Sequence, residues 1–262
     1  MNTEKTIAIK GFIGFKNWGD DIAPILVEKI SGVKPCVFPV KEKYNQNDPP
    51  HVYLTIGSIL SFADSKTIVW GSGFRENETL SEIPHKICAV RGPLTRKKLL
   101  ELGVSCPEVY GDPALLMPKF YQPKNLKKVK LGIIPHYVDQ DNPWIKKIAS
   151  NKDVKIIDIR GGHFDFIDQV YSCEYIASSS LHGIIVADAY GIPSTWLKLS
   201  NKIIGGNFKF DDYFASVGRN EETSLIVNPN TSINEIMANF KTYSLEIDLD
   251  KLIEACPLIE KY

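Results

Sequence analysis

The stretch EYIASSSLHGIIVADAYGIPSTWLKL (174–199) decides the fold class, because it joins two short apolar segments through a helix-like one. Residues 174–179 and 193–199 are short apolar runs that include β-branched and aromatic side chains, a composition that favours strands. Between them, the apolar run after His182 ends at a glycine and a proline, which is typical of a helix and its terminus. A strand, a helix and a second strand in this order predict parallel strands in an α/β fold.

The same alternation extends along the rest of the chain. Residues 20–32 and 92–103 are expected to be helices, because each segment ends at a glycine and the second also begins with Gly-Pro. Further short apolar runs predict strands at residues 6–12, 37–40, 51–57, 67–73, 86–90, 130–136 and 154–159. The pattern predicts an α/β protein with mainly parallel sheets.

Proline and lysine concentrate in residues 115–130, which suggests a linker between the first five strands and the next four. We therefore expect a first domain over residues 1–125 and a second over residues 126–242, which holds the SSSLHG motif. Residues 243–262 are expected to form a helical tail that packs back on the first domain.

Composition excludes several functional classes. The 262 residues include 31 basic and 31 acidic side chains, so no net charge attracts nucleic acid or an anionic membrane. The five cysteines are widely spaced without a CxxC pair, which predicts neither a disulfide framework nor a zinc site. No segment approaches the ~20 apolar residues of a membrane span, and the N-terminus does not resemble a signal peptide. A cytoplasmic protein without a metal or other cofactor is expected.

Small and polar residues follow most of the expected strands. Ligands of open α/β sheets bind beyond the carboxyl ends of the strands, and small residues with exposed amides favour a small anion there. Neither GxGxxG nor GxxxxGK[ST] occurs, which disfavours a nicotinamide enzyme or a nucleotide triphosphatase. The residues at these strand ends include Asn17, Asp20, Ser72, Gly73, Arg91, Asp112, His136, Arg160, Ser180, Leu181, His182 and Gly183.

Two of these residues are the strongest candidates for chemistry. Arg91 ends an apolar strand and precedes Gly-Pro, although a surface ion pair is an alternative role. His182 falls in the first turn of an expected helix, where the helix dipole disfavours imidazolium and keeps a neutral imidazole available. The alternative for His182 is a packing role, and Asp20 can equally cap the helix that it opens.

Six segments together resemble the polysaccharide pyruvyltransferase family, nearest to its shorter bacterial exopolysaccharide members. They occur in order between residues 8 and 220: NWGD (17–20), VWGSG (69–73), VRGPLTRKKLLELG (90–103), YGDPALL (110–116), SSSLHGIIVADAYGIP (178–193) and FKFDDYFASVGR (208–219). The resemblance implies two Rossmann-like domains arranged as in GT-B glycosyltransferases. It also implies transfer of pyruvate from phosphoenolpyruvate, the co-substrate, onto two sugar hydroxyls, which leaves a cyclic ketal and phosphate.

The resemblance assigns Arg91 and His182 to the donor and to catalysis. With them, Ser72, Gly73, Ser180, Leu181, Gly183 and Arg160 are expected to bind the donor. For the glycan acceptor, either free or lipid-linked, the expected residues are Asn17, Asp20, Asp112, His136, Lys209 and Arg219. Many family members carry arginine where this chain has Ser180, so one anion-binding charge is either missing or replaced by Arg160, Lys209 or Arg219.

Two other functions stay open at this point. One is a GT-B glycosyltransferase that uses a nucleotide sugar, although no carboxylate for a ribose can be assigned. The other is a non-catalytic protein that binds a glycan or an anion, which the serine at position 180 favours.

Overall fold

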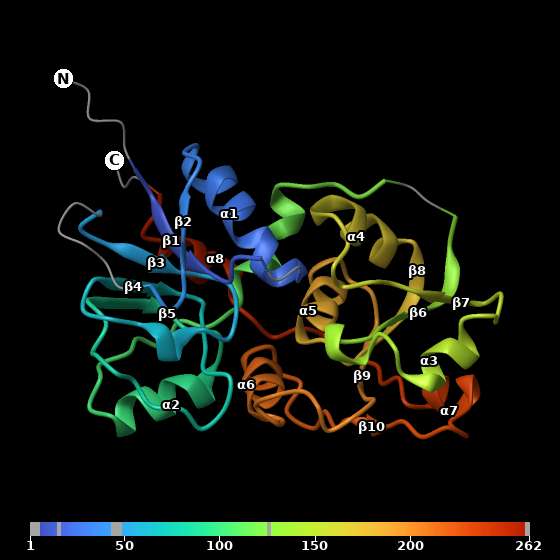
Figure 1. The fold of residues 1–262 in the computed structure, drawn as a ribbon. Coiled ribbons are helices and arrows are strands. Elements are labelled where there is room, and N and C mark those ends of the chain that lie inside the picture. The colour runs from blue at the N-terminus through green and yellow to red at the C-terminus, as the bar shows by residue number, and fades with distance from the viewer. Residues whose placement is uncertain (1–5, 15–16, 43–48, 125–126, 260–262) are drawn as a thin grey trace.

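The computed structural model describes residues 6–14, 17–42, 49–124 and 127–259, which contain two five-stranded sheets (Figure 1). All paired strands in both sheets are parallel. The first sheet has the order β2-β1-β3-β4-β5 and the second the order β7-β6-β8-β9-β10. Both sheets therefore reverse their direction of winding next to their first strand, between β1 and β3 and between β6 and β8.

The expected fold class, α/β with two Rossmann-like parallel sheets, is confirmed. The first sheet consists of β1 (Ala8–Gly11), β2 (Cys36–Pro39), β3 (Val52–Leu54), β4 (Thr67–Trp70) and β5 (Lys86–Ala89). The second consists of β6 (Val129–Ile134), β7 (Val154–Ile156), β8 (Cys173–Ser178), β9 (Ser194–Lys198) and β10 (Leu225–Ile226). Only β10 was not predicted, because two residues are too few for a period-2 pattern.

The helices cover both faces of the sheets and lie between them. They are α1 (Trp18–Ser31), α2 (Pro93–Glu101), α3 (Pro143–Ile148), α4 (His163–Tyr171), α5 (Leu181–Ala189), α6 (Phe208–Ser216), α7 (Ile233–Ala238) and α8 (Leu249–Glu254). Three short 3₁₀ turns complete them: η1 (Leu60–Phe62), η2 (Pro113–Lys119) and η3 (Tyr137–Asp139). The described part of the chain has no helix long and apolar enough to cross a membrane.

One hydrophobic core joins the two sheets. Helices α1, α4 and α5 contact one another or η2 in the space between the sheets (Figure 1). Trp18 of α1 packs on Phe166 of α4 at 5.4 Å between ring centroids, and its indole Nε1 donates to the carbonyl of His163. Almost every residue of α5 is buried, because the helix has apolar neighbours on all sides.

The expected linker is wrong in its first part. Residues 114–117 of η2 are buried in the shared core against α1 and α5, so this segment belongs to the packed interior. The expected boundary near residue 125 falls on residues 125–126, outside the described residues. The division into domains at residues 125 and 242 stays a prediction.

The end of the chain returns to the first sheet. Helix α7 stays with the second sheet, where Ile236 packs in the core formed with β6 and α3. Helix α8 lies on the first half, and the Trp70 indole Nε1 donates to the carbonyl of Leu252 at 2.8 Å. The expected return of the C-terminal helices to the first domain is therefore confirmed for α8.

Candidate active site

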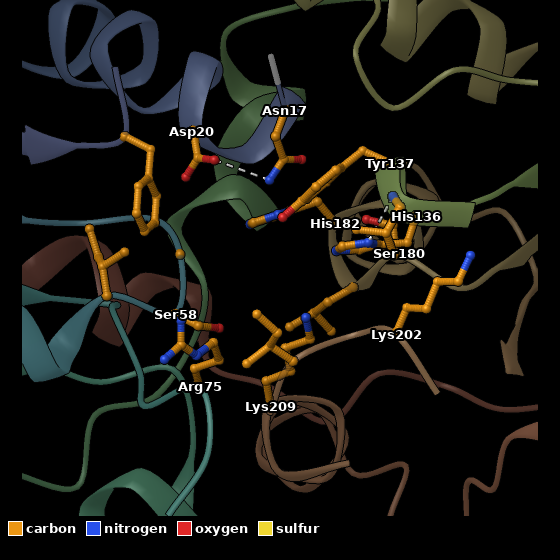
Figure 2. Close-up of a pocket in the computed structure, with 16 residues that line it drawn as sticks. Asn17, Asp20, Ser58, Arg75, His136, Tyr137, Ser180, His182, Lys202 and Lys209 are labelled. Atoms are coloured by element: carbon orange, nitrogen blue, oxygen red, sulfur yellow. Dashed lines mark hydrogen bonds between the residues drawn. The ribbon is translucent and has the colours of Figure 1, made fainter. Parts of the chain in front are cut away.

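A pocket of about 270 Å³ lies between the carboxyl ends of the two sheets (Figure 2). Both sheets contribute the loops at the points where their winding reverses, which is where open α/β sheets bind ligands. The pocket is lined by Phe12, Asn17, Asp20, Gly57, Ser58, Ile59, Arg75, His136, Tyr137, Val138, Ser180, Leu181, His182, Lys202, Ile204 and Lys209.

The first sheet supplies a wall with an acidic group. Asn17 and Asp20 stand at the start of α1, directly after β1, and the Asn17 amide donates to the Asp20 carboxylate at 3.1 Å. Ser58 enters the pocket from the loop after β3, at the bottom of the view in Figure 2. The expected position of Asp20 at a helix start is thus correct, and its side chain faces the cavity.

The serine run of the second sheet builds the opposite wall, and each serine has a different task. The Ser178 hydroxyl donates to the carbonyl of Ser180 at 2.8 Å or of Ile134 at 3.1 Å, accepts from the Ser180 backbone N–H, and so closes the turn between β8 and α5. The Ser179 hydroxyl accepts from the His136 backbone N–H at 2.8 Å, which ties the loop after β6 to this turn. Ser180 then lines the pocket beside Leu181 and His182, at the N-terminal end of α5.

His182 lies against the start of α1. A methyl group added at Gly19 would come within 2.0 Å of Cε1 and 2.1 Å of Nδ1 of the His182 ring. The Trp18 ring flanks the imidazole with centroids 6.3 Å apart. The NWGD segment therefore has three roles: Gly19 leaves room for the imidazole, Trp18 packs beside it, and Asp20 faces the pocket.

Basic side chains dominate the rest of the wall. Arg75, Lys202 and Lys209 surround the lower half of the pocket (Figure 2). Arg75 pairs through Nη2 with Glu76 and Glu78, while its Nε is buried without a partner among the described residues. Burial lowers the pKa of Lys209 to about 8, with Arg91 and Arg75 acting in the same direction and Asp20 opposing them.

Two more titratable groups of the pocket have altered pKa values. Burial raises the pKa of Asp20 to about 6, against the opposing effects of His182, Asn17 and Lys209. Burial, with help from Lys209 and His182, lowers the pKa of His136 to about 3, so this imidazole is neutral at physiological pH. The pocket can thus bind an anion and accept a proton at Asp20.

Arg91 lies behind the pocket wall and not in it. Its guanidinium is buried and donates to Asp212 of α6 at 3.0 Å, to the Ser58 hydroxyl at 2.6 Å and to the Phe74 carbonyl at 2.6 Å. Asp212 also accepts from the Thr95 hydroxyl at 2.7 Å. Arg91 therefore links the end of β5 to α6 and supports Ser58 from behind.

Four further residues expected at the donor or acceptor also lie outside the lining. The buried Ser72 hydroxyl donates to the Gly57 carbonyl at 3.0 Å, and Gly73 packs against the Arg91 guanidinium. Gly183 packs against the Ser178 hydroxyl. Asp112 is buried behind His182, with its Oδ2 at 3.8 Å from Nε2 of the imidazole.

Two expected arginines lie away from the pocket. Arg160 is nearly half exposed and pairs with Asp158 two residues before it at 2.7 Å. Arg219 is buried in a network with Asp188, Ser194 and Glu222. Of the three residues expected to replace the charge missing at Ser180, only Lys209 lines the pocket.

Several lining residues were not predicted as site residues. Ser58, which follows the third expected strand (51–57), is one of the strand-end residues, whereas Arg75 comes two residues after the Gly-Ser-Gly that ends the fourth apolar run. Extending that strand end by two residues finds Arg75. Lys202 and Ile204 lie in a loop after β9 whose sequence shows no periodic pattern. Their position depends on tertiary packing alone.

The fold and the pocket define an α/β protein with two Rossmann-like parallel sheets and, between them, a cavity lined by Arg75, Lys202 and Lys209 beside Asp20 and His182. Residues 42–201 match the sequence pattern of the family described as polysaccharide pyruvyl transferase, which is more than half of the chain. The chain therefore belongs to the polysaccharide pyruvyl transferase family.

Two curated proteins are similar in sequence. "Uncharacterized protein L143" of Acanthamoeba polyphaga mimivirus is 31% identical over 94% of this chain and 87% of its own length. "Succinoglycan biosynthesis protein ExoV" of Rhizobium meliloti is 30% identical over 65% of this chain, but only 55% of that protein is covered. A solved Klebsiella pneumoniae structure, of the functionally uncharacterized protein KP1_0663, has a TM-score of 0.49 and 13% identity, covering 85% of this chain and 93% of its own.

Proposed function

We propose that the protein transfers pyruvate from phosphoenolpyruvate onto two hydroxyl groups of a sugar in a polysaccharide or its precursor, forming a cyclic ketal and phosphate. The observation that supports this most directly is the pocket that gathers Arg75, Lys202 and Lys209 around Asp20 and His182. Such a pocket suits a donor with a carboxylate and a phosphate, together with the proton transfers that ketal formation needs.

The donor is bound by charges that lie close together. The guanidinium of Arg75 and the ammonium of Lys209, both in the pocket lining, are donors for its anionic oxygens. The N-terminal end of α5, at Ser180 and Leu181, adds the positive end of a helix dipole. In this proposal Lys209 supplies the charge that other members hold in an arginine at the position of Ser180.

The acceptor approaches from the side of Asp20. Asn17 and Asp20 orient the two sugar hydroxyls, and His136 adds a neutral polar edge. Tyr137 is 43% exposed and lies over His136 with ring centroids 4.3 Å apart, so its free face can stack on a sugar ring. Asp112 and Arg219 do not reach this cavity.

Two side chains carry the protons in the proposed reaction. The first sugar oxygen attacks C2 of phosphoenolpyruvate while His182 takes the hydroxyl proton and delivers it to the methylene carbon, which becomes the methyl group. The second hydroxyl then attacks the same carbon, phosphate leaves with its electron pair, and Asp20 takes the second proton. A pKa of about 6 lets Asp20 accept that proton and release it near neutral pH.

The test is incubation of the purified protein with phosphoenolpyruvate and a glycan, with release of phosphate and the ketal methyl signal in proton NMR as readouts. We expect both products in equal amounts, and neither from His182→Ala, which controls for a contaminating phosphatase. Release of a nucleoside diphosphate from a nucleotide sugar would instead show a glycosyltransferase. Saturable binding without turnover would show a binding protein.

A further inference from the structure

The imidazole of His182 has one nitrogen that the pocket does not use. Nε2 is buried and has no hydrogen-bond partner among the described residues. The ring lines the pocket, and of its two nitrogens only Nε2 is buried without a partner, so Nδ1, beside the backbone of Gly19, is the nitrogen left for a ligand in the pocket. Buried imidazole nitrogens normally have a partner, so the surroundings of Nε2 need an explanation.

The buried nitrogen faces a buried carboxylate oxygen, Oδ2 of Asp112, that also lacks a partner among the described residues. Oδ2 of Asp112 lies 3.8 Å from Nε2 of His182, and this oxygen accepts no hydrogen bond within the described ranges. The Asp112 side chain is 1% exposed and the His182 side chain 11%. A distance of 3.8 Å is too long for a hydrogen bond, but catalytic hydrogen bonds are often long in ligand-free structures and shorten in the complex.

The other carboxylate oxygen fixes the orientation of Asp112. Oδ1 accepts from the backbone N–H of Ala114 at 2.9 Å and caps the start of η2. This contact leaves Oδ2 directed at the imidazole. Trp18 and the backbone of Gly19 hold the ring from the sides and limit its rotation.

We propose that Asp112 is a positioning residue which holds His182 in the Nε2–H tautomer, so that the unprotonated Nδ1 faces the pocket as the proton acceptor. The carboxylate also stabilises the imidazolium that forms when Nδ1 takes the hydroxyl proton. Asp112 does not touch the substrate and does not itself become protonated. The catalytic part of this inference rests on the proposed pyruvyl transfer, whereas the tautomer does not.

The informative variant is Asp112→Asn, because the cap at Ala114 decides how the new amide sits. The amide oxygen is needed to accept from the Ala114 N–H, so the NH₂ group faces His182. Nε2 must then accept a hydrogen bond, and the ring proton moves to Nδ1. The nitrogen facing the pocket is thereby converted from an acceptor into a donor.

The tautomer is measured by ¹⁵N and ¹³C NMR of protein with labelled histidine, with the His182 signals assigned by their loss in His182→Gln. We expect the Nε2–H tautomer in the unmodified protein and the Nδ1–H tautomer in Asp112→Asn. The matched control is Asp248→Asn, which changes another aspartate that caps a helix, at the start of α8, and should leave the His182 signals unchanged. An Nδ1–H tautomer in the unmodified protein overturns the proposal, even if the variant does not fold.

Kinetics separates this inference from the proposed function. Turnover of Asp112→Asn should fall by about 10²- to 10⁴-fold, the range for losing a general base or its correct tautomer, while the KM for phosphoenolpyruvate stays the same. Full turnover in a variant with the switched tautomer overturns the catalytic role. If the unmodified protein transfers no pyruvate but the His182 tautomer changes in Asp112→Asn as expected, the Asp112 contact is supported and the proposed function is contradicted.

Discussion

The contact between Gly19 and His182 illustrates how a residue without a side chain can define a site. The imidazole occupies the space in which a β-carbon of residue 19 would lie. Gly19 has no positive φ, so its conformation alone does not require glycine. Space for the histidine is what requires glycine, and the choice of residue at position 19 is therefore part of the candidate site.

Gly19→Ala should have opposite effects on stability depending on residue 182. With His182 present, the added methyl group overpacks the site and should lower the free energy of unfolding by about 1–3 kcal/mol. In the His182→Ala background the space is free. Alanine at position 19 should then raise the free energy of unfolding by up to about 1 kcal/mol, because alanine has a higher helix propensity than glycine. Urea unfolding of the four proteins measures the effect. The same sign in both backgrounds would show that the ring does not occupy this space.

Lys209 predicts a pH dependence of donor binding. Its pKa of about 8 means that the ammonium is charged below pH 8 and neutral above it. The affinity for phosphoenolpyruvate should therefore be retained near neutral pH and decrease as the pH rises through 8. In Lys209→Arg this loss should disappear, since a guanidinium stays protonated up to pH ~12. Calorimetric titrations at several pH values check this, with Lys146→Arg on α3 as a control. If the affinity of Lys209→Arg for phosphoenolpyruvate still decreased above pH 8, the decrease would be due to the titration of a residue other than Lys209.

At the scale of elements, α6 connects the two halves of the molecule. It lies between β9 and β10 of the second sheet in the sequence but packs on α2 of the first half. Asp212 of α6 accepts from Arg91 and Thr95, and its carbonyl lies where a β-carbon of Gly92 would be. The Arg-Gly-Pro segment is therefore a docking site for α6, and α6 in turn presents Lys209 to the pocket.

Arg91→Lys and Asp212→Asn should have parallel effects. Asp212→Asn removes one partner of the buried ion pair, which costs about 3–5 kcal/mol of folding stability. Arg91→Lys keeps the positive charge but loses the guanidinium that donates to Asp212, Ser58 and Phe74 together. Both should also raise the KM for phosphoenolpyruvate, because α6 and Lys209 shift together. Thermal unfolding and donor kinetics on the two variants measure these effects. A weaker donor affinity in Arg91→Lys alone would show that Arg91 binds the donor directly.

The sequence predicted the strands and helices better than it predicted the hydrogen-bond partners of the site residues. The strands were predicted because their apolar runs are short and end at small residues, and the rule for strand ends places Asp20, His136 and His182 at the pocket. Helix α6 was not predicted as a helix, since Asp211 and Asp212 interrupt its three buried aromatic residues, Phe210, Tyr213 and Phe214. The role of Arg91 depends on Asp212, which is 121 positions away, and no local pattern reveals such a pair.

For the whole molecule, the shared core predicts cooperative unfolding. Apolar residues of α1, η2, α4 and α5 form one continuous cluster that includes strands of both sheets. We expect a single calorimetric transition in which the calorimetric and van't Hoff enthalpies agree. Two separate transitions would contradict the prediction and would show that each half is stable without the other. Differential scanning calorimetry with and without phosphoenolpyruvate measures this, and bound donor should move the whole transition upward.

The shared core also limits how this protein can be engineered or can diversify. An exchange of the second sheet for that of a relative, made to obtain a new acceptor specificity, would place a foreign α4 against Trp18 and a foreign α5 against η2. Helix α8, which follows the exchanged sheet in the sequence, would also have to restore its hydrogen bond with Trp70 of the first half. New specificities should therefore arise by changes in the loops after the strands, where Tyr137 and Ile204 lie at the surface, and not by recombination of whole halves.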